Sequence, residues 1–302
     1  MGLVDVALRK VRDEGIASVL ASGISDPLEM VYVSDTFRYI SSQYCRFRPI
    51  RSRGVVIDAS DKILRSEAHK LLMGRYEDEI VDFVHTYIPR HYDVVELGGG
   101  IGFVSCNIDR RRSGGEHVVL EPNPEIIPVL KRNRALNDCR FEIVESAYNP
   151  AGTDVELAVD EQFIKASTVR GLQDVSTTVQ VPGVDLQWIG ETFAIERFVL
   201  IADIEGAEVE LVDSELEFVL ESCPYVVIEY HHFADVDADV RSAKETLESS
   251  ELIALDRRKD DNTEKVIYHN PRFRDHRRDE LDELSLERRS PTDQDPQRGE
   301  RT

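Results

Sequence analysis

The sequence lacks the features that would place the chain in a membrane or outside the cell. It has no run of about 18 to 20 apolar residues, the length that a membrane-spanning helix needs, and its N-terminus has no signal-peptide apolar block. Its four cysteines lie far apart and form no CxxC pair, which argues against a disulfide framework or a zinc site. We therefore expect reduced, buried thiols, no membrane span and a cytoplasmic location.

Positive charge is also scarce. The chain carries 58 acidic and 37 basic residues, a formal net charge of -21, and lysine is rarer than arginine. Because nucleic acids are bound by basic surfaces, this balance argues against a nucleic-acid partner. Acidic residues spread along a whole chain are typical of a halophile, where salt screens their mutual repulsion. We therefore expect a halophilic protein that salt stabilises; an ordinary acidic mesophilic protein is the alternative.

Composition divides the chain into three parts. Residues 1–74 place apolar side chains near helical spacing and predict a helical N-terminal extension, either a packing or oligomerisation appendage or a lid over substrate. Residues 75–270 contain short apolar runs separated by helical segments, which predicts one catalytic domain. Residues 271–302 are charged, with Phe273 as their only aromatic residue, and predict a disordered tail. The sequence leaves open whether the chain forms a homo-oligomer.

The central part predicts an α/β fold. Seven apolar runs are expected to be strands: 93–97, 117–120, 141–144, 198–202, 225–229, 252–255 and 265–268. Several are too continuously apolar for a half-exposed sheet, so we expect both faces to be covered. The prediction is a Rossmann-like fold, with a mostly parallel seven-stranded sheet and helices on both faces. Residues 154–181, where Val and Thr alternate with polar residues, predict an inserted hairpin.

The strongest local signal is VVELGGGIGF, residues 94–103, in which an apolar strand runs straight into glycines. Glycine lets the backbone turn tightly and approach a ligand closely, and the N-terminus of the following helix would present N–H groups to the ligand. The spacing is GxGxG, and Phe103 stands where the dinucleotide fingerprint has its third glycine. This departure from the dinucleotide fingerprint argues against NAD as the ligand.

A carboxylate follows at a suitable distance. The next apolar run ends in VVLEPNP, which places Glu121 about one βα unit after the loop. There it could accept hydrogen bonds from both ribose hydroxyls of a nucleoside. A structural glutamate at a strand end is the alternative. Loop and carboxylate together favour a nucleoside ligand without a pyrophosphate.

Several segments resemble the FkbM family of methyltransferases. They are ELGGGIGF, EPNP, RNRALN and above all VLIADIEGAEVELV (residues 199–212), whose DxEGAE element is the most specific. The similar region covers roughly residues 75–269 and includes RYE (75–77), VPGVDLQWI (181–189) and IEYHH (228–232). The resemblance implies an S-adenosylmethionine-dependent methyltransferase fold. It also implies methyl transfer to hydroxyl groups of small-molecule, sugar or glycan-linked acceptors.

The resemblance also implies which residues bind the cofactor. Carried over by position, they are Glu96, Gly98, Gly100 and Gly102 in the loop, Glu121 and Asn123 in EPNP, and Ser146 and Ala147, which with Glu145 would lie beside the adenine. The sequence departs from the family pattern at Ile201, where the family usually has a lysine.

A hydroxyl acceptor needs alignment and a base. Candidate catalytic residues at or just beyond predicted C-terminal strand ends, where open α/β sheets bind ligands, are Asp203, Glu205, Glu229 and His231, with His232 beside them. Asp203 is favoured because it follows FVLIA, the run expected at the centre of the sheet. Each has a structural alternative: Asp203 could cap the next helix, Glu205 could complement its dipole, and the two histidines could be solvated loop residues.

The same carboxylates with His231 could hold a divalent metal, but no regular ligand spacing supports one, so a metal is possible but not favoured and no metal ligand is assigned. The sequence thus favours an S-adenosylmethionine-dependent O-methyltransferase. Two other functions stay open. A nicotinamide-dependent oxidoreductase is disfavoured by the missing third glycine and the absence of a YxxxK pattern. A catalytically silent methyltransferase-like scaffold would bind partners instead.

Overall fold

The computed structural model describes residues 35–59, 65–159, 166–168, 178–204, 206–232, 237–259 and 263–273. The expectations for residues 1–34, for the tail from 274 onward and for Glu205 lie outside these residues. Within the described ranges, no helix is both long enough and apolar enough to cross a membrane.

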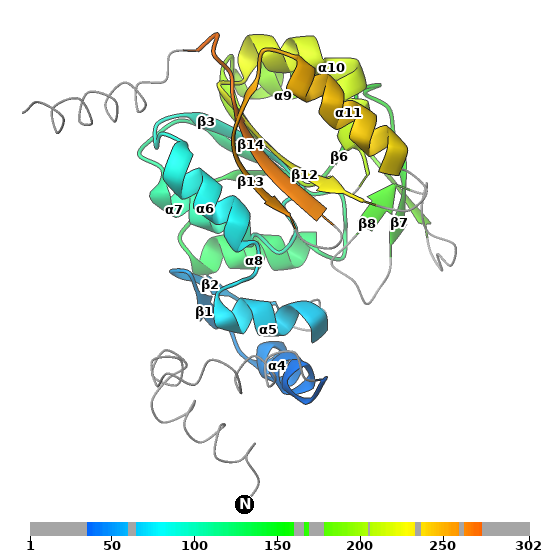
Figure 1. Cartoon of the computed structure of the whole chain (residues 1–302). Coiled ribbons are helices and arrows are strands. Elements are labelled where there is room, and N and C mark those ends of the chain that lie inside the picture. The colour runs from blue at the N-terminus through cyan, green and yellow to red at the C-terminus, as the bar shows by residue number, and fades with distance from the viewer. Residues whose placement is uncertain are drawn as a thin grey trace, which may run out of the picture.

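A seven-stranded sheet forms the centre of the molecule, with the strand order β13-β14-β12-β11-β3-β4-β5 (Figure 1). The strands are β3 (Asp93–Leu97), β4 (His117–Leu120), β5 (Glu142–Val144), β11 (Phe198–Ala202), β12 (Tyr225–His231), β13 (Ile253–Lys259) and β14 (Thr263–His269). All neighbouring pairs from β12 to β5 are parallel, whereas β14 is antiparallel to both β12 and β13. The Rossmann-like α/β prediction is therefore confirmed.

The expectation of a mostly parallel sheet holds from β12 to β5 and is wrong for β13 and β14, which form the other side of the sheet. Only residues 260–262 separate β13 from β14. A parallel pair needs a crossover of a dozen or more residues, so such a short connection allows only an antiparallel pair. Apolar runs alone do not report strand direction, which is why the sequence did not predict this edge.

Helices cover both faces of the sheet, as predicted (Figure 1). One face packs against α6 (Asp78–Tyr87), α7 (Phe103–Arg111) and α8 (Ile127–Leu136), and the other against α9 (Leu186–Phe193), α10 (Glu208–Ser222) and α11 (Asp237–Ser249). All five residues of β11 are buried, as expected for a central strand between two helical layers. The apolar run FVLIA thus places Asp203, the next residue, at the carboxyl end of the central strand.

The described part of the N-terminal region contains α4 (Asp35–Phe47), the strands β1 (Ile50–Ser52) and β2 (Val55–Ile57), and α5 (Arg65–Met73). β1 and β2 pair as an antiparallel hairpin, where the sequence predicts only helix. Strands of three residues are too short for a two-residue alternation to stand out from a helical pattern.

Two asparagines from the RNRALN segment attach this hairpin to α8. The side chain of Asn137 accepts the Val56 N–H at 2.8 Å and donates to the Val56 carbonyl at 2.7 Å. Asn133 accepts the Asp58 N–H at 2.8 Å and donates to the carbonyl of Ile101 in the glycine loop, also at 2.8 Å. The hairpin is therefore tied to the helix that supports the loop.

A small antiparallel sheet interrupts the domain between β6 (Ala147–Tyr148) and β10 (Gly183–Val184). It consists of β7 (Val155–Val159), β8 (Ala166–Thr168) and β9 (Thr178–Val181), in the order β8-β7-β9. The expected hairpin is present in antiparallel form, with a third strand.

Candidate active site

The glycine loop joins the end of β3 to α7, which begins at Phe103. Its backbone is left-handed at Gly98 and Gly102, with φ of 94° and 81°, where a side chain would be strained. A Cβ on Gly98 would lie 1.9 Å from the carbonyl oxygen of Asp203. The Asp203 N–H donates to the carbonyl of Leu97 at 2.9 Å. Glycine at position 98 therefore lets the ends of β3 and β11 meet.

Glu121 lies at the end of β4 and faces this loop. Its Oε2 accepts the Gly100 N–H at 2.7 Å, and its Oε1 accepts the Asn123 N–H at 2.8 Å. Burial raises the pKa of the Glu121 carboxyl to about 7, and the two N–H groups offset only part of that effect. A carboxylate has about four acceptor positions, so two are left for a ligand. The structure thus brings Glu121 to the loop as the sequence suggested.

Asn123 adds a donor beside this acceptor. Its side chain is buried, and its Oδ1 accepts the Glu125 N–H at 3.0 Å. Its Nδ2 has no hydrogen-bond partner within the part of the chain that the structure describes. A buried donor without a partner is costly unless a ligand supplies an acceptor. An acceptor on Glu121 next to a donor on Asn123 fits the polar groups of a nucleoside.

Ser146 and Ala147 are buried on the neighbouring strand segment. The carbonyl of Val144 accepts both the Glu121 N–H at 3.0 Å and the Ser146 N–H at 2.9 Å. Ser146 is therefore held beside Glu121, where the family pattern places the adenine. Glu145 instead pairs with Lys131 on the surface.

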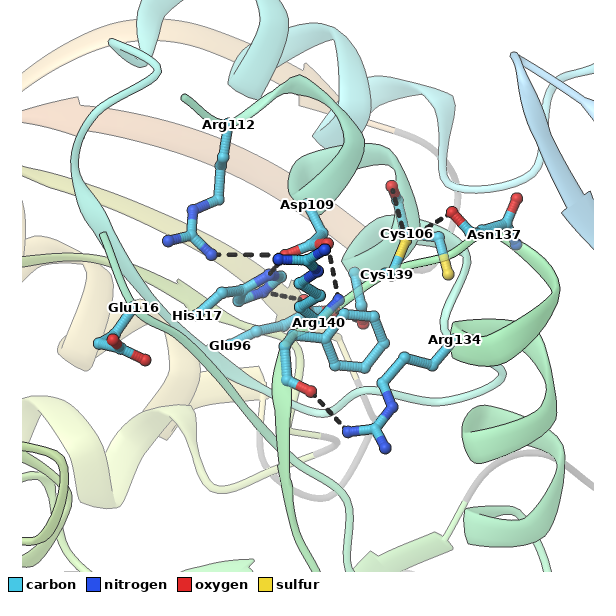
Figure 2. A network of polar contacts seen from close by, with 12 residues as sticks. Glu96, Cys106, Asp109, Arg112, Glu116, His117, Arg134, Asn137, Cys139 and Arg140 are labelled. Atoms are coloured by element: carbon cyan, nitrogen blue, oxygen red, sulfur yellow. Dashed lines mark hydrogen bonds and ion pairs between the residues drawn. The ribbon is translucent and has the colours of Figure 1, made fainter. Parts of the chain in front are cut away.

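Glu96 lies behind the loop. Its Oε1 accepts the Ser105 hydroxyl at 2.9 Å, and its Oε2 is 3.2 Å from Nε2 of His117. Figure 2 shows His117 between Glu96 and Asp109. Both oxygens of Glu96 thus contact side chains of α7 and β4, so this residue ties the loop helix to the sheet. A direct contact with the cofactor stays a prediction.

A second group of side chains gathers at the ends of β11 and β12. Nε2 of His231 lies 3.5 Å from Oδ1 of Asp203 and 3.8 Å from Oε1 of Glu229. The structure therefore brings together three of the four predicted catalytic residues, and the fourth, Glu205, lies outside the described residues. His232 is separate from them, with its Nε2 3.9 Å from Glu264.

The alternative role of Asp203 as a helix cap does not hold, because α10 begins at Glu208 and its N-cap is Ala207. Glu208 is a site residue that sequence reasoning missed. It is fully buried; its Oε1 lies 2.6 Å from Nδ1 of His231, and its Oε2 accepts the Gly206 N–H at 2.9 Å. The signal that could have revealed it is the last glutamate of DIEGAE, the most specific segment of the family resemblance.

Glu77 also belongs to this group, although its RYE segment received no role from the sequence. One carboxylate oxygen from each of Glu77, Asp203 and Glu229 lies within 4.8 Å of the other two. The adjacent Tyr76 is buried edge-on against Phe103, with ring centroids 5.4 Å apart. Burial first, and then nearby carboxylates that include Glu77 and Glu67, raise the pKa of Tyr76 well above its usual value. The RYE segment therefore connects the glycine loop to the acidic group.

The comparisons with known proteins agree with this geometry. A family model described as the methyltransferase FkbM domain matches residues 96–255. The chain belongs to this family. The match begins at Glu96 on β3, includes Glu121 and Asp203, and ends in β13. The resemblance noted in the sequence is thereby confirmed. No curated protein matches the sequence.

Several solved structures match the chain at low sequence identity and low TM-score. A putative O-methyltransferase from Klebsiella pneumoniae is 13% identical, with a TM-score of 0.41, covering 84% of this chain and 94% of that chain. A methyltransferase from Pyrococcus furiosus is 12% identical, with a TM-score of 0.41, covering 78% and 97%. A fibrillarin pre-rRNA processing protein from Methanococcus jannaschii is 12% identical, with a TM-score of 0.39, covering 60% and 66%. Likeness this distant carries no information about the substrate.

Proposed function

We propose that this FkbM-family methyltransferase uses S-adenosylmethionine to methylate a hydroxyl group of a small-molecule, sugar or glycan-linked acceptor. Membership of the family establishes methyl transfer as the activity class. The cofactor, the oxygen-directed chemistry and the acceptor are the proposed parts.

The observation that carries the cofactor proposal is the contact between the buried Glu121 carboxylate and the Gly100 N–H, beside Nδ2 of Asn123, which has no partner among the described residues. Glu121 would accept the ribose hydroxyls and Asn123 would donate to the ligand. Phe103 occupies the position of the third glycine in a dinucleotide-binding loop, and its ring is buried against Tyr76. The loop therefore lacks the third glycine of the dinucleotide fingerprint. Bound S-adenosylmethionine supplies a sulfonium methyl group that a nucleophile can take.

The second group of side chains supports oxygen as the target. A hydroxyl becomes a good nucleophile only when it is oriented and its proton is drawn away. Asp203, Glu229 and His231 present acceptor atoms at the carboxyl ends of two central strands, next to the loop. Such a group suits a hydroxyl, which must lose a proton, better than an apolar carbon.

The charge of the chain narrows the acceptor class. With a formal net charge of -21, the surface repels polyanions, which argues against RNA as the methylated molecule. The sheet of β7, β8 and β9 interrupts the domain directly after β6, which carries Ala147. We assign to it the shaping of the acceptor pocket.

Calorimetry on the purified chain tests the cofactor. S-adenosylmethionine and S-adenosylhomocysteine are expected to bind, and NAD is not. NAD binding without S-adenosylhomocysteine binding would overturn the proposal in favour of an oxidoreductase. Binding of neither, by a folded protein, would overturn it in favour of the silent scaffold.

A further inference from the structure

The acidic group formed by Glu77, Asp203 and Glu229 comes from three parts of the chain. Glu77 is the residue before α6, Asp203 follows β11, and Glu229 lies in β12. One oxygen of each lies within 4.8 Å of the others. Oxygen ligands surround Mg²⁺ at about 2.1 Å and Ca²⁺ at about 2.3 to 2.6 Å, so ligands on opposite sides of one ion are about 4 to 5 Å apart. The three oxygens therefore lie within reach of a single ion.

Glu229 gives a second and independent indication. Only 6% of its side chain is exposed. Its Oε1 lies 2.9 Å from Nζ of Lys265, but its buried Oε2 has no hydrogen-bond partner among the residues that the structure describes. A buried carboxylate oxygen is costly to leave unsatisfied, and a cation would satisfy it.

His231 is oriented as metal-binding histidines are. Its Nδ1 lies 2.6 Å from Oε1 of the fully buried Glu208. When Nδ1 donates to this carboxylate, Nε2 keeps the lone pair that a metal needs. That nitrogen faces Asp203 and Glu229 at 3.5 and 3.8 Å. A carboxylate that holds the far nitrogen of an imidazole is a common second partner of metal-binding histidines.

Charge balance is consistent with a divalent ion. Three carboxylates bring three negative charges, and Lys265 offsets one of them. Two negative charges are left over. Carboxylate oxygens, which are the majority of the available ligand atoms, suit Mg²⁺ or Mn²⁺.

We propose that one divalent cation, Mg²⁺ or Mn²⁺, binds between Glu77, Asp203 and Glu229, with Nε2 of His231 as a fourth ligand. The sequence alone did not favour a metal, because its candidate ligands have no regular spacing. The role of the ion rests on the proposed function: it would bind the acceptor oxygen and lower the pKa of that hydroxyl. An acceptor with two neighbouring oxygens, such as a vicinal diol, would chelate it best.

Mn²⁺ binding to the full chain, measured by electron paramagnetic resonance in 1 M KCl, tests the site without any acceptor. The salt suppresses diffuse binding to the acidic surface. One tight Mn²⁺ per chain is expected. Glu77→Gln and Glu229→Gln should each weaken it more than about tenfold, and Glu208→Gln by about 10- to 100-fold, the usual effect of losing the partner of a ligand.

The matched control is Glu116→Gln, which removes one exposed charge. Glu116 lies just before β4, at the amino ends of the parallel strands, whereas the acidic group lies at their carboxyl ends. This control variant should leave Mn²⁺ affinity unchanged. Absence of tight binding, or equal weakening by Glu116→Gln and Glu77→Gln, would overturn the metal site. Glu77 is only half-buried and precedes its helix, so its variant should fold even if Glu229→Gln does not. S-adenosylmethionine affinity measured in EDTA separates the two proposals: if it persists without Mn²⁺ binding, only the metal site is wrong.

Discussion

The site has a cofactor half, formed by the glycine loop and Glu121, and an acceptor half, formed by the acidic group. The two halves hold their carboxylates by different means. On the cofactor side, both oxygens of Glu121 accept backbone N–H groups, from Gly100 and Asn123. On the acceptor side, Glu229 and Asp203 face the side chains of Lys265 and His231. Backbone groups are fixed by the fold, whereas side chains can be exchanged without moving it. Substitutions in the loop should therefore act mainly through folding, whereas substitution of Asp203, which is more exposed than Glu229, should act mainly through chemistry.

Asp203→Asn tests the acceptor half and carries the largest expected effect. The change keeps the shape and removes the charge, so turnover should fall by roughly 10² to 10⁴ while cofactor affinity and melting temperature stay nearly the same. The control is Asp185→Asn, since Asp185 caps α9 by accepting the Trp188 N–H at 2.6 Å. Asparagine caps equally well, so this variant should keep full turnover. Equal turnover in both variants would remove Asp203 from the chemistry.

Gly98→Ala tests the cofactor half through folding. Its Cβ would meet the Asp203 carbonyl oxygen at 1.9 Å, and its φ of 94° adds strain. Denaturant unfolding should show a loss of about 3 to 5 kcal/mol. Gly54→Ala is the control, because Gly54 has a φ of 89° with nothing within 4 Å of its Cβ, and it should lose only about 1 kcal/mol. Similar losses in the two variants would mean that the close approach of β3 and β11 does not matter.

Glu121→Ala tests the cofactor half through affinity. Loss of hydrogen bonds to a charged group should weaken S-adenosylmethionine binding by roughly 1.5 to 3 kcal/mol in calorimetry. Glu142→Ala removes an exposed carboxylate from the far end of β5 and should leave the affinity unchanged. If both variants bind as the original chain does, the ribose is held elsewhere.

The pH dependence gives the smallest and most specific effect. The pKa of Glu121 is about 7 in the fold and about 4.5 when exposed, so the folded chain takes up a proton between these values. Lowering the pH from 8 to 6 should therefore stabilise the cofactor-free chain by about 1 kcal/mol from this group. The same change should weaken cofactor affinity about tenfold, since a protonated carboxyl accepts fewer hydrogen bonds.

Glu121→Ala should lose both dependences, which separates this group from the eight histidines. Stability and affinity that move in the same direction with pH would contradict the account of a buried, ligand-binding carboxylate.

The sequence predicted the cofactor half better than the acceptor half. Glu121 and the loop could be predicted from contiguous motifs, because an apolar strand followed directly by glycines indicates a tight turn at the end of that strand. The acceptor half combines segments more than a hundred residues apart, Glu77 with Asp203 and Glu229. No local pattern encodes that contact, which depends on α6 packing against β14. Glu208 was missed because its partner, His231, lies on another element.

The most direct test of the account is to find where the methyl group goes. Methyl-labelled S-adenosylmethionine is incubated with the chain and a panel of sugars, glycan fragments and hydroxylated small molecules, and products are located by mass spectrometry and NMR. The account predicts label on a hydroxyl oxygen, with transfer strongly reduced in Asp203→Asn and retained in Asp185→Asn. Label on nitrogen or carbon, or full transfer by the Asp203→Asn variant, would contradict it.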